Sequence, residues 1–296
     1  MALKAGIVGL PNVGKSTLFN AITKKNILAA NYPFATIDPN VGVVTVPDSR
    51  LEYLENLYVP ERTIPTTFEF TDIAGLVKGA ASGEGLGNKF LSHIRETDAI
   101  VEVVRCFDDA DIIHVEGKTD PIRDIEIINV ELILADLEIA ENRVSKIQKK
   151  AETTKDKDAV AEYEVLKKCV DALTNNIPLR HLDFSEDELL QLKNFNFITL
   201  KPIIYVANVS EDDVVVGEND YTKKVKDYAS KEGASVVVMC AKMESELSEL
   251  NDDDKKQFLN DLGIKNSVLD KLIFATYNLL GLQTFFTVGK DECRAW

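Results

Sequence analysis

Short apolar runs alternate with amphipathic stretches along most of the chain, which is typical of a sheet covered by helices. The apolar runs predict strands at residues 5–8, 41–46, 66–71, 98–105, 202–207, 236–239 and 284–290. Helical periodicity between them predicts helices at residues 49–57, 88–97, 221–230, 252–262 and 267–280, with another beginning at residue 17. We therefore expect an α/β fold.

A different pattern occupies residues 125–198. Apolar residues recur there at mostly three- and four-residue spacings up to residue 147 and again over residues 160–173, on either side of a polar break at residues 153–158. This pattern predicts two long amphipathic helices that form an antiparallel hairpin. Ser185 and Glu188 form a capping-box pattern that predicts a third, short helix. We interpret the segment as a helical arm inserted between two strands.

The segment Gly9-Leu10-Pro11-Asn12-Val13-Gly14-Lys15-Ser16-Thr17 matches the phosphate-binding pattern G-x-x-x-x-G-K-[ST]. It follows a predicted strand and precedes a predicted helix, which is the context that the motif requires. The loop would direct its backbone N–H groups at one anion, assisted by the helix N-terminus. We expect Lys15 to reach the β- and γ-phosphates and Ser16 to hold Mg²⁺. The nucleotide-binding residues predicted here are Asn12, Val13, Gly14, Lys15, Ser16 and Thr17.

Two later segments have the properties of nucleotide-sensing switches. Residues 31–40 form a proline-containing loop in which Thr36 could supply a second hydroxyl to Mg²⁺; a plain connecting loop is the alternative. A D-x-x-G pattern ends the strand at residues 66–71, so Asp72 would hold a Mg²⁺-bound water and the Gly75 N–H would approach the γ-phosphate. The glycine-rich residues 79–87 indicate a second flexible segment.

The strand at residues 202–207 leads into Asn208-Val209-Ser210-Glu211, where guanine-binding P-loop proteins carry N-K-x-D. Val209 replaces the lysine that covers the base, and Glu211 replaces the aspartate that accepts from guanine N1–H and N2–H₂. Both changes weaken guanine selectivity and make ATP plausible. After the strand at 236–239, a loop resembling the base-contacting S-A-K loop would also hold adenine; it consists of Cys240, Ala241 and Lys242.

The irregular segment after residue 105 contains Asp108, Asp109, Asp111 and His114. A metal site is one interpretation, although a single histidine without ligand spacing argues against it. His114 could instead approach the γ-phosphate of a bound nucleotide.

Composition limits the remaining possibilities. A net charge of −15 argues against a surface coated with basic residues for nucleic acid, so DNA is not an expected partner. A lysine-rich arm tip is the best candidate for an RNA contact, and a solvated tip with acidic neighbours is the alternative. These lysines are Lys146, Lys149, Lys150, Lys155 and Lys157.

Four scattered cysteines without a C-x-x-C pair indicate free thiols in a reducing compartment. No run of about 18 apolar residues predicts a membrane span, and the N-terminus lacks a secretion-signal pattern. These features predict a cytoplasmic protein that does not use a membrane as partner.

Together these motifs resemble those of the Obg-like ATPase (YchF) family. The similarity rests on the P-loop at 9–17, on Asn31-Tyr32-Pro33-Phe34-Ala35-Thr36, on residues 72–80 and 85–91, and on the Asn-x-x-Glu variant at 208–211. The resemblance implies a nucleotide-binding domain at 1–124 and 199–281, a coiled-coil-like insertion at 125–198, and the start of a C-terminal TGS domain at 282–296. A lone strand at 284–290 is no domain, so we expect that the sequence is cut short or that this strand pairs elsewhere.

The resemblance also implies ATP hydrolysis in preference to GTP, and association with ribosomes through the arm and the TGS domain. Leu76 stands where Ras-like proteins have a catalytic glutamine, and His114 matches the family's proposed substitute for orienting water. We expect a Mg²⁺-dependent ATPase with slow turnover. A GTPase, or a nucleotide-gated RNA-binding or ribosome-binding module with negligible hydrolysis, are the alternatives.

Overall fold

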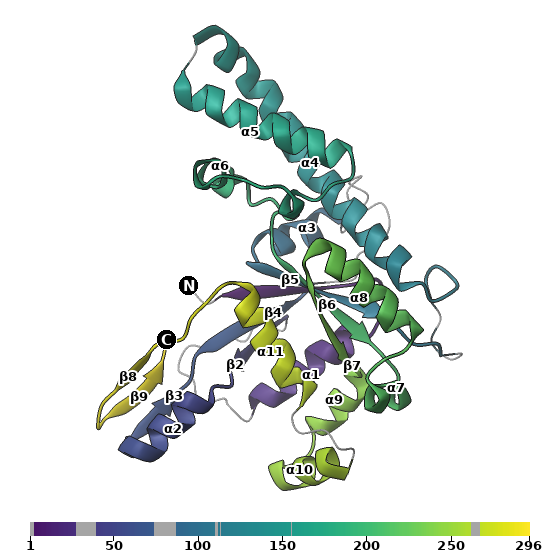
Figure 1. Cartoon of the computed structure of the whole chain (residues 1–296), viewed down its shortest axis with the longest axis vertical. Coiled ribbons are helices and arrows are strands. Elements are labelled where there is room, and N and C mark those ends of the chain that lie inside the picture. Colours follow the sequence, from purple (N-terminus) through teal and green to yellow (C-terminus); the bar gives the residue numbers. More distant parts are fainter. Residues whose placement is uncertain are drawn as a thin grey trace.

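The structure, a computed structural model (Figure 1), describes residues 3–27, 40–73, 87–109, 112, 114–154, 156–261 and 267–296. Its main sheet has six strands in the order β2-β4-β1-β5-β6-β7. They are β1 (Lys4–Val8), β2 (Val41–Thr45), β4 (Thr67–Asp72), β5 (Ala99–Arg105), β6 (Ile203–Asn208) and β7 (Ser235–Met239). Each overlaps a run predicted from the sequence, which confirms the α/β fold class.

Strand β2 runs antiparallel to β4, and the other neighbouring pairs are parallel. The strands are apolar because helices cover both faces of a parallel sheet; every residue of β5 and β6 is buried. The carboxyl ends of β1, β4, β5, β6 and β7 consequently share one edge of the sheet. Ligands of open α/β sheets bind at this edge.

Helices α1 (Lys15–Ile27) and α11 (Val268–Leu279) pack on one face of the sheet, and α3 (Gly87–Arg95), α4 (Pro121–Thr154) and α8 (Asp220–Glu232) lie on the other (Figure 1). Three shorter helices follow β6 and β7. They are α7 (Glu211–Val216), α9 (Ala241–Leu247) and α10 (Asp252–Asp261). None of the helices in the described ranges is both long and apolar enough to span a membrane.

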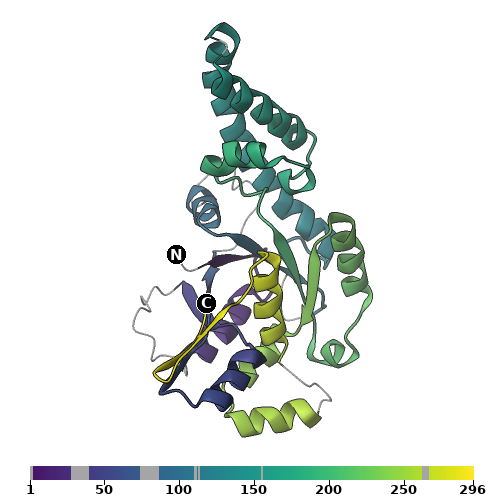
Figure 2. The same ribbon diagram turned by 60° about the vertical axis from the view of Figure 1, so that its left-hand side comes forward.

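The predicted helical hairpin is present as an arm that projects from the sheet (Figure 2). It consists of the distal half of α4, which packs against α5 (Lys157–Thr174), and of the short helix α6 (Glu186–Leu192). Ser185 caps α6 in the predicted capping box. A separate apolar cluster, which includes Leu166, Leu173 and Phe197, holds the arm together.

The first half of α4 packs with the sheet. Ile125, Ile128 and Leu132 are buried in the main core rather than in the arm cluster. One continuous helix therefore belongs to the sheet at its beginning and to the arm at its end. The domain boundaries predicted from the sequence stay a prediction. Helix α4 (Pro121–Thr154) continues across the boundary that was placed between residues 124 and 125.

A second, three-stranded sheet joins distant parts of the chain in the order β3-β9-β8. Strand β8 (Phe286–Val288) forms a hairpin with β9 (Glu292–Ala295), and β9 pairs in parallel with β3 (Arg62–Ile64). Helix α2 (Ser49–Tyr58) covers this sheet through Leu51. Of the two outcomes expected for the C-terminal strand, the structure therefore shows pairing elsewhere in the chain.

Candidate functional site

The P-loop connects β1 to α1 in a conformation that depends on its glycine. Asn12 and Gly14 both have positive φ angles, of 63° and 96°. A Cβ atom on Gly14 would lie 2.2 Å from Asn208 Nδ2, so a side chain is excluded there by contact as well as by backbone conformation. Leu10 and Val13 are buried and anchor the loop, while Asn12 and Ser16 are exposed. The loop thus presents its polar groups outward from an apolar base.

Lys15 begins α1 and points at the end of β4. Its Nζ lies 2.9 Å from Asp72 Oδ1, and its side chain is 9% exposed. Asp72 is held in turn by its backbone N–H, which donates to Asn40 O at 2.9 Å. The P-loop lysine and the carboxylate of the D-x-x-G pattern are thus brought together, as the two motifs require.

Asn208 lies at the end of β6 and joins two loops. Its Nδ2 donates to Val13 O at 2.8 Å, and its Oδ1 accepts the Ala241 N–H at 2.9 Å. The side chain is therefore engaged with the P-loop on one side and with the loop after β7 on the other. The sequence suggested a contact with the base; the structure adds this bridging contact, which no sequence pattern indicated.

Glu211, which replaces the aspartate of the guanine-binding pattern, contacts the lysine of the S-A-K-like loop across the same edge. Lys242 Nζ lies 2.7 Å from Glu211 Oε1. Contact with Glu211 raises the pKa of Lys242. Val209 is buried, and burial also raises the pKa of the neighbouring Cys240 thiol. Both side chains are largely exposed, at 70% and 51%, so this is a weak surface pair that would have to rearrange if Glu211 accepted from a base.

A cavity of about 640 Å³ opens between the P-loop and these two loops. Its volume is in the range of sites that hold small ligands. Of the sequence-predicted residues, it is lined by Asn12, Gly14, Thr17, Asn208, Val209, Cys240, Ala241 and Lys242.

The cavity also has a wall formed by the loop after β5, a segment that the sequence marked as a candidate without indicating which of its residues line the site. Phe107, Asp108 and Ile112 line it. Arg105 shapes this loop by donating to three of its carbonyl oxygens, those of Phe107, Asp109 and Ile112 at 3.0–3.3 Å. The only available signal was an arginine at the end of an apolar strand, which does not reveal its acceptors.

His114 lies on the same loop but lines no part of the cavity. Its ring is buried, Nε2 is 2.8 Å from Asp124 Oδ2, and Nδ1 accepts the Glu116 N–H at 3.1 Å. Both ring nitrogens therefore have protein partners. The predicted role in orienting water stays a prediction, with the added finding that α4 holds the ring.

Two predicted residues, Thr36 and Gly75, lie outside the described residues, as does Lys155 of the arm tip. Within the described ranges, no three His, Cys, Asp or Glu side chains gather as a metal-binding group. The oxygen ligands that remain for Mg²⁺ at the P-loop are the Ser16 hydroxyl and the Asp72 carboxylate, which are hard donors of the type that Mg²⁺ prefers.

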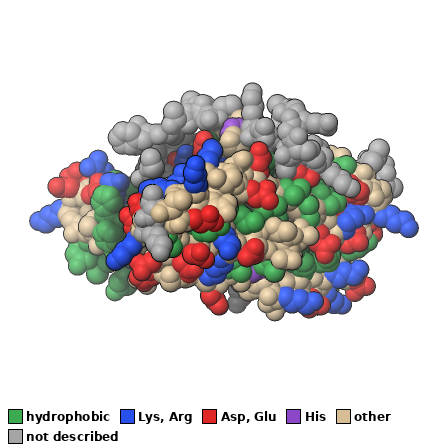
Figure 3. All heavy atoms as spheres, turned by 90° about the horizontal axis from the view of Figure 1, so that it is seen from above, with side chains coloured by type: hydrophobic (Ala, Val, Ile, Leu, Met, Phe, Trp, Pro, Cys, Tyr) green, Lys and Arg blue, Asp and Glu red, His purple; other side chains and the backbone are tan. Residues whose placement is uncertain are grey.

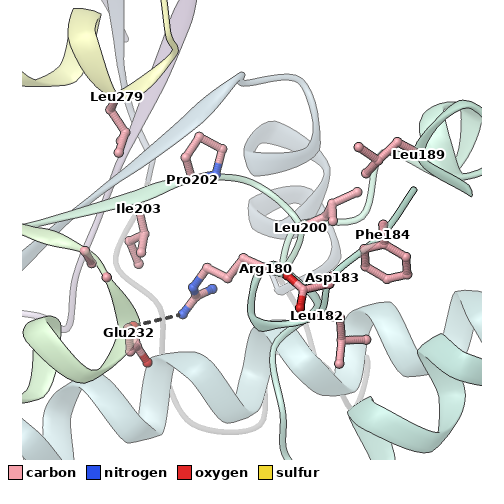
Figure 4. A pocket seen from close by; sticks show the side chains of 12 residues that line it. Arg180, Leu182, Asp183, Phe184, Leu189, Leu200, Pro202, Ile203, Glu232 and Leu279 are labelled. Carbon is pink, nitrogen blue, oxygen red and sulfur yellow. Dashed lines mark ion pairs between the residues drawn. The ribbon is translucent and has the colours of Figure 1, made fainter. Parts of the chain in front are cut away.

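A second cavity, of about 430 Å³, lies at the base of the arm and contains none of the predicted site residues (Figure 4). Arg180 extends across it toward Glu232, with Nη2 3.6 Å from Oε2. Glu232 also accepts the Tyr205 hydroxyl at 2.8 Å, and Arg180 donates to Asn129 Oδ1 at 2.9 Å. These contacts connect β6, α4 and α8 to the arm base, so we interpret them as structural.

Comparison with known proteins agrees with this geometry. A family model described as a 50S ribosome-binding GTPase matches residues 4–134. The ribosome-binding ATPase YchF of Bacillus subtilis (strain 168) is 58% identical over 297 residues, which cover 100% of this chain and 81% of that protein. The protein of the same name from Escherichia coli O157:H7 is 54% identical over 296 residues, with the same coverage of both chains.

A solved structure is similar over almost the whole chain. The Schizosaccharomyces pombe YchF GTPase superposes with a TM-score of 0.88 at 43% sequence identity, covering 99% of this chain and 80% of that one. Sequence identity and structural similarity therefore both lead to YchF proteins. The chain belongs to the YchF family.

Proposed function

We propose that this protein is a Mg²⁺-dependent, ATP-hydrolysing switch that associates with ribosomes. The proposal rests mainly on the cavity between the P-loop and the Glu211–Lys242 pair. One end of this cavity is the phosphate-binding loop, and the other is formed by the loops that would contact the base. The relatives from B. subtilis and E. coli, which are named ribosome-binding ATPases, support the same reading.

At the phosphate end, the P-loop N–H groups and Lys15 would neutralise the β- and γ-phosphate oxygens. Ser16 and Thr36 would hold Mg²⁺ directly and Asp72 through water, with the Gly75 N–H directed at the γ-phosphate. When bound, Mg²⁺ supplies positive charge that stabilises the leaving diphosphate. The fit is supported by the missing Cβ of Gly14 and by the Lys15–Asp72 pair, which places both groups at one point.

At the base end, Val209 and residues 240–242 would hold adenine, with Asn208 fixing the loops that contact it. A guanine base needs an acceptor for two N–H donors, and Glu211 is already engaged by Lys242 at 2.7 Å. Adenine lacks those two donors, so the Glu211–Lys242 pair removes no hydrogen bond that adenine would make. We therefore infer a preference for ATP over GTP.

Turnover is inferred to be slow in the isolated chain. Leu76 replaces the glutamine that orients water in Ras-like proteins, and His114 is proposed to orient water instead. Because both nitrogens of the His114 ring are engaged by Asp124 and Glu116, the Glu116 N–H must release Nδ1 before the ring can orient water, which is consistent with slow turnover. Catalysis would rest on positioning and charge stabilisation.

Ribosome association is assigned to the arm, whose tip carries Lys146, Lys149 and Lys157 without carboxylate partners within 4 Å among the described residues, whereas Lys150 pairs with Asp156. Seen from above, basic and acidic side chains alternate on the visible face (Figure 3). A mixed surface favours a contact limited to a few lysines over a broad RNA-binding face. We infer a cytoplasmic location from this partner.

The deciding experiment is a competition between ATP and GTP for the purified chain, followed by single-turnover hydrolysis of each. We expect ATP to bind at least tenfold more tightly, which corresponds to about 1.4 kcal/mol. A tenfold preference for GTP would overturn the adenine assignment. His114→Ala should slow hydrolysis with little change in ATP affinity, and unchanged hydrolysis would remove the role of His114.

A GTPase is the second candidate, because the matching family model and the S. pombe structure are both described as GTPases. The same competition distinguishes the two. A nucleotide-gated ribosome-binding module without significant hydrolysis is the third, and it would show ATP-dependent binding to ribosomes with no hydrolysis above background.

A further inference from the structure

The contact between His114 and Asp124 joins the loop after β5 to the first turn of α4. The two atoms, Nε2 and Oδ2, are 2.8 Å apart, and the side chains are only 4% and 3% exposed. We propose that Asp124 is the positioning residue for His114: it fixes the tautomer of the ring and holds it on α4. This inference rests on the proposed function, in which His114 orients the attacking water.

The hydrogen bonds define which ring nitrogen carries the proton. Glu116 N–H donates to Nδ1, so Nδ1 is unprotonated and Nε2 carries the hydrogen that it donates to Asp124. A histidine whose one nitrogen donates to a carboxylate keeps the other nitrogen as an acceptor. Nδ1 is therefore the atom that can accept a hydrogen bond from water once the Glu116 N–H gives it up.

Asp124 is itself held on its second oxygen. Arg123 donates to Oδ1 through Nη2 at 3.0 Å and through Nε at 3.3 Å. This leaves Oδ2 directed at the imidazole. The carboxylate also lies in the first turn of α4, where the helix dipole favours a negative charge.

Two further buried groups are affected by the charge of Asp124. Burial raises the pKa of Glu102 on β5, and the charge of Asp124 adds to that shift. Burial, with a smaller effect of Asp124, also raises the pKa of Cys106 to about 12. The direct partners of the ring and of the Asp124 carboxylate are Arg123 on α4 and the Glu116 N–H.

Helix α4 gives Asp124 a rigid support. Twelve residues further along the same helix, Asp136 accepts from Arg95 of α3 at 2.8 Å and from the Thr199 N–H at 2.7 Å. These contacts fix the helix to α3 and to the segment that precedes β6. The His114 ring, which is hydrogen-bonded to Asp124, is therefore held by a helix that is itself fixed in place.

The test compares Asp124→Asn with the unaltered protein. We expect kcat for ATP to fall about tenfold or more with KM unchanged. The amide of Asn can present its NH₂ group to Nε2, which favours the opposite tautomer, with the proton on Nδ1. The lower kcat then follows from the loss of Nδ1 as an acceptor. Asp124→Glu should restore part of the rate.

Asp120→Asn is the matched control, because Asp120 precedes the same helix and contacts Arg123 N–H but not the ring. It should leave kcat, KM and the tautomer of His114 unchanged. A fall in kcat for Asp124→Asn that Asp124→Glu does not partly restore, with the tautomer of the ring unchanged, would mean a merely structural role and would overturn the proposal.

Nitrogen NMR of the imidazole supplies a readout that does not depend on hydrolysis. In the unaltered protein, His114 should show protonated Nε2 and unprotonated Nδ1, and the opposite tautomer would overturn the proposal even if Asp124→Asn fails to fold. The population of this tautomer should fall in Asp124→Asn. If it falls while His114→Ala hydrolyses ATP normally, the failure belongs to the proposed function of His114 rather than to the contact.

Discussion

The ammonium group of Lys15 lies 2.9 Å from the carboxylate of Asp72, so the two groups expected to act on the phosphates and on Mg²⁺ contact each other. A triphosphate would have to replace Asp72 as the partner of Lys15. Without Mg²⁺, Asp72 therefore competes with the phosphates for Lys15. With Mg²⁺, Asp72 instead helps to hold the metal and so supports nucleotide binding.

Asp72→Asn should consequently have opposite effects in the two conditions. Without Mg²⁺, ATP affinity should rise by about threefold to tenfold, because the competing ion pair and a negative charge near the phosphates are lost. With Mg²⁺, the gain in affinity caused by the metal should shrink. Titration of a fluorescent ATP analogue with Mg²⁺ or with EDTA measures both effects. Glu69→Gln is the control, because Glu69 lies on the same strand as Asp72 and forms a 3.5 Å pair with Lys4 of β1; equal changes in both variants would contradict the prediction.

The regular elements were predictable because burial on a parallel sheet imposes continuous apolar runs. The run at 41–46 became β2 (Val41–Thr45), and the periodic segment of the arm became α4, which ends at Thr154, and α5, which begins at Lys157. The P-loop could be located because its motif specifies a local strand, loop and helix. These are properties of neighbouring residues, and a single sequence contains them.

Contacts between distant residues were not predictable in the same way. Strand β3 has only three residues, too few to show a pattern, and its partner β9 lies more than 200 positions later. The Asn208 bridge, the carbonyl contacts of Arg105 and the Asp124 partner of His114 each depend on how loops meet at the edge of the sheet. The motifs predicted the site residues, whereas packing determines what those residues contact.

The Glu211–Lys242 pair predicts how base preference can be changed. Val209→Lys combined with Glu211→Asp should shift the ratio of ATP to GTP affinity toward GTP by about tenfold, because a shorter carboxylate can accept both guanine donors and a lysine stem can cover the base. Competition binding measures the ratio. Glu218→Asp, in the exposed 2.9 Å pair with Lys226, is the matched control, and a ratio that stays constant in the double variant argues against this base site.

The arm tip predicts a separable effect on ribosome binding. Replacement of Lys146, Lys149 and Lys157 by glutamate should abolish co-sedimentation with ribosomes at physiological salt, since charge contacts to RNA phosphates are lost. ATP affinity should not change, because the tip is remote from the P-loop (Figure 1). Reversal of three exposed lysines on α8, Lys223, Lys224 and Lys231, is the control for net charge. If both sets of replacements weaken sedimentation equally, the contact is not at the tip.

Glu102 predicts an unusual dependence of stability on pH. Its side chain is fully buried in β5, and neither carboxylate oxygen has a hydrogen-bond partner among the described residues. Burial raises its pKa well above 4.5, with Glu232 and Asp124 adding to the shift and Arg180 opposing it. The folded protein therefore binds more protons at this site than the unfolded chain once the pH exceeds 4.5, so this group's contribution to stability falls as pH rises.

Glu102→Gln removes this titration while keeping the shape of the protonated acid. The variant should have nearly the same urea midpoint as the unaltered protein near pH 4 and a higher one at about pH 8. Glu232→Gln should do the opposite at the higher pH, because Glu232 accepts the Tyr205 hydroxyl and pairs with Arg180. Urea denaturation of the three proteins at both pH values checks the sign. A lower midpoint for Glu102→Gln at the higher pH would mean that the ionised carboxylate is stabilised by Arg180 more than it is destabilised by burial.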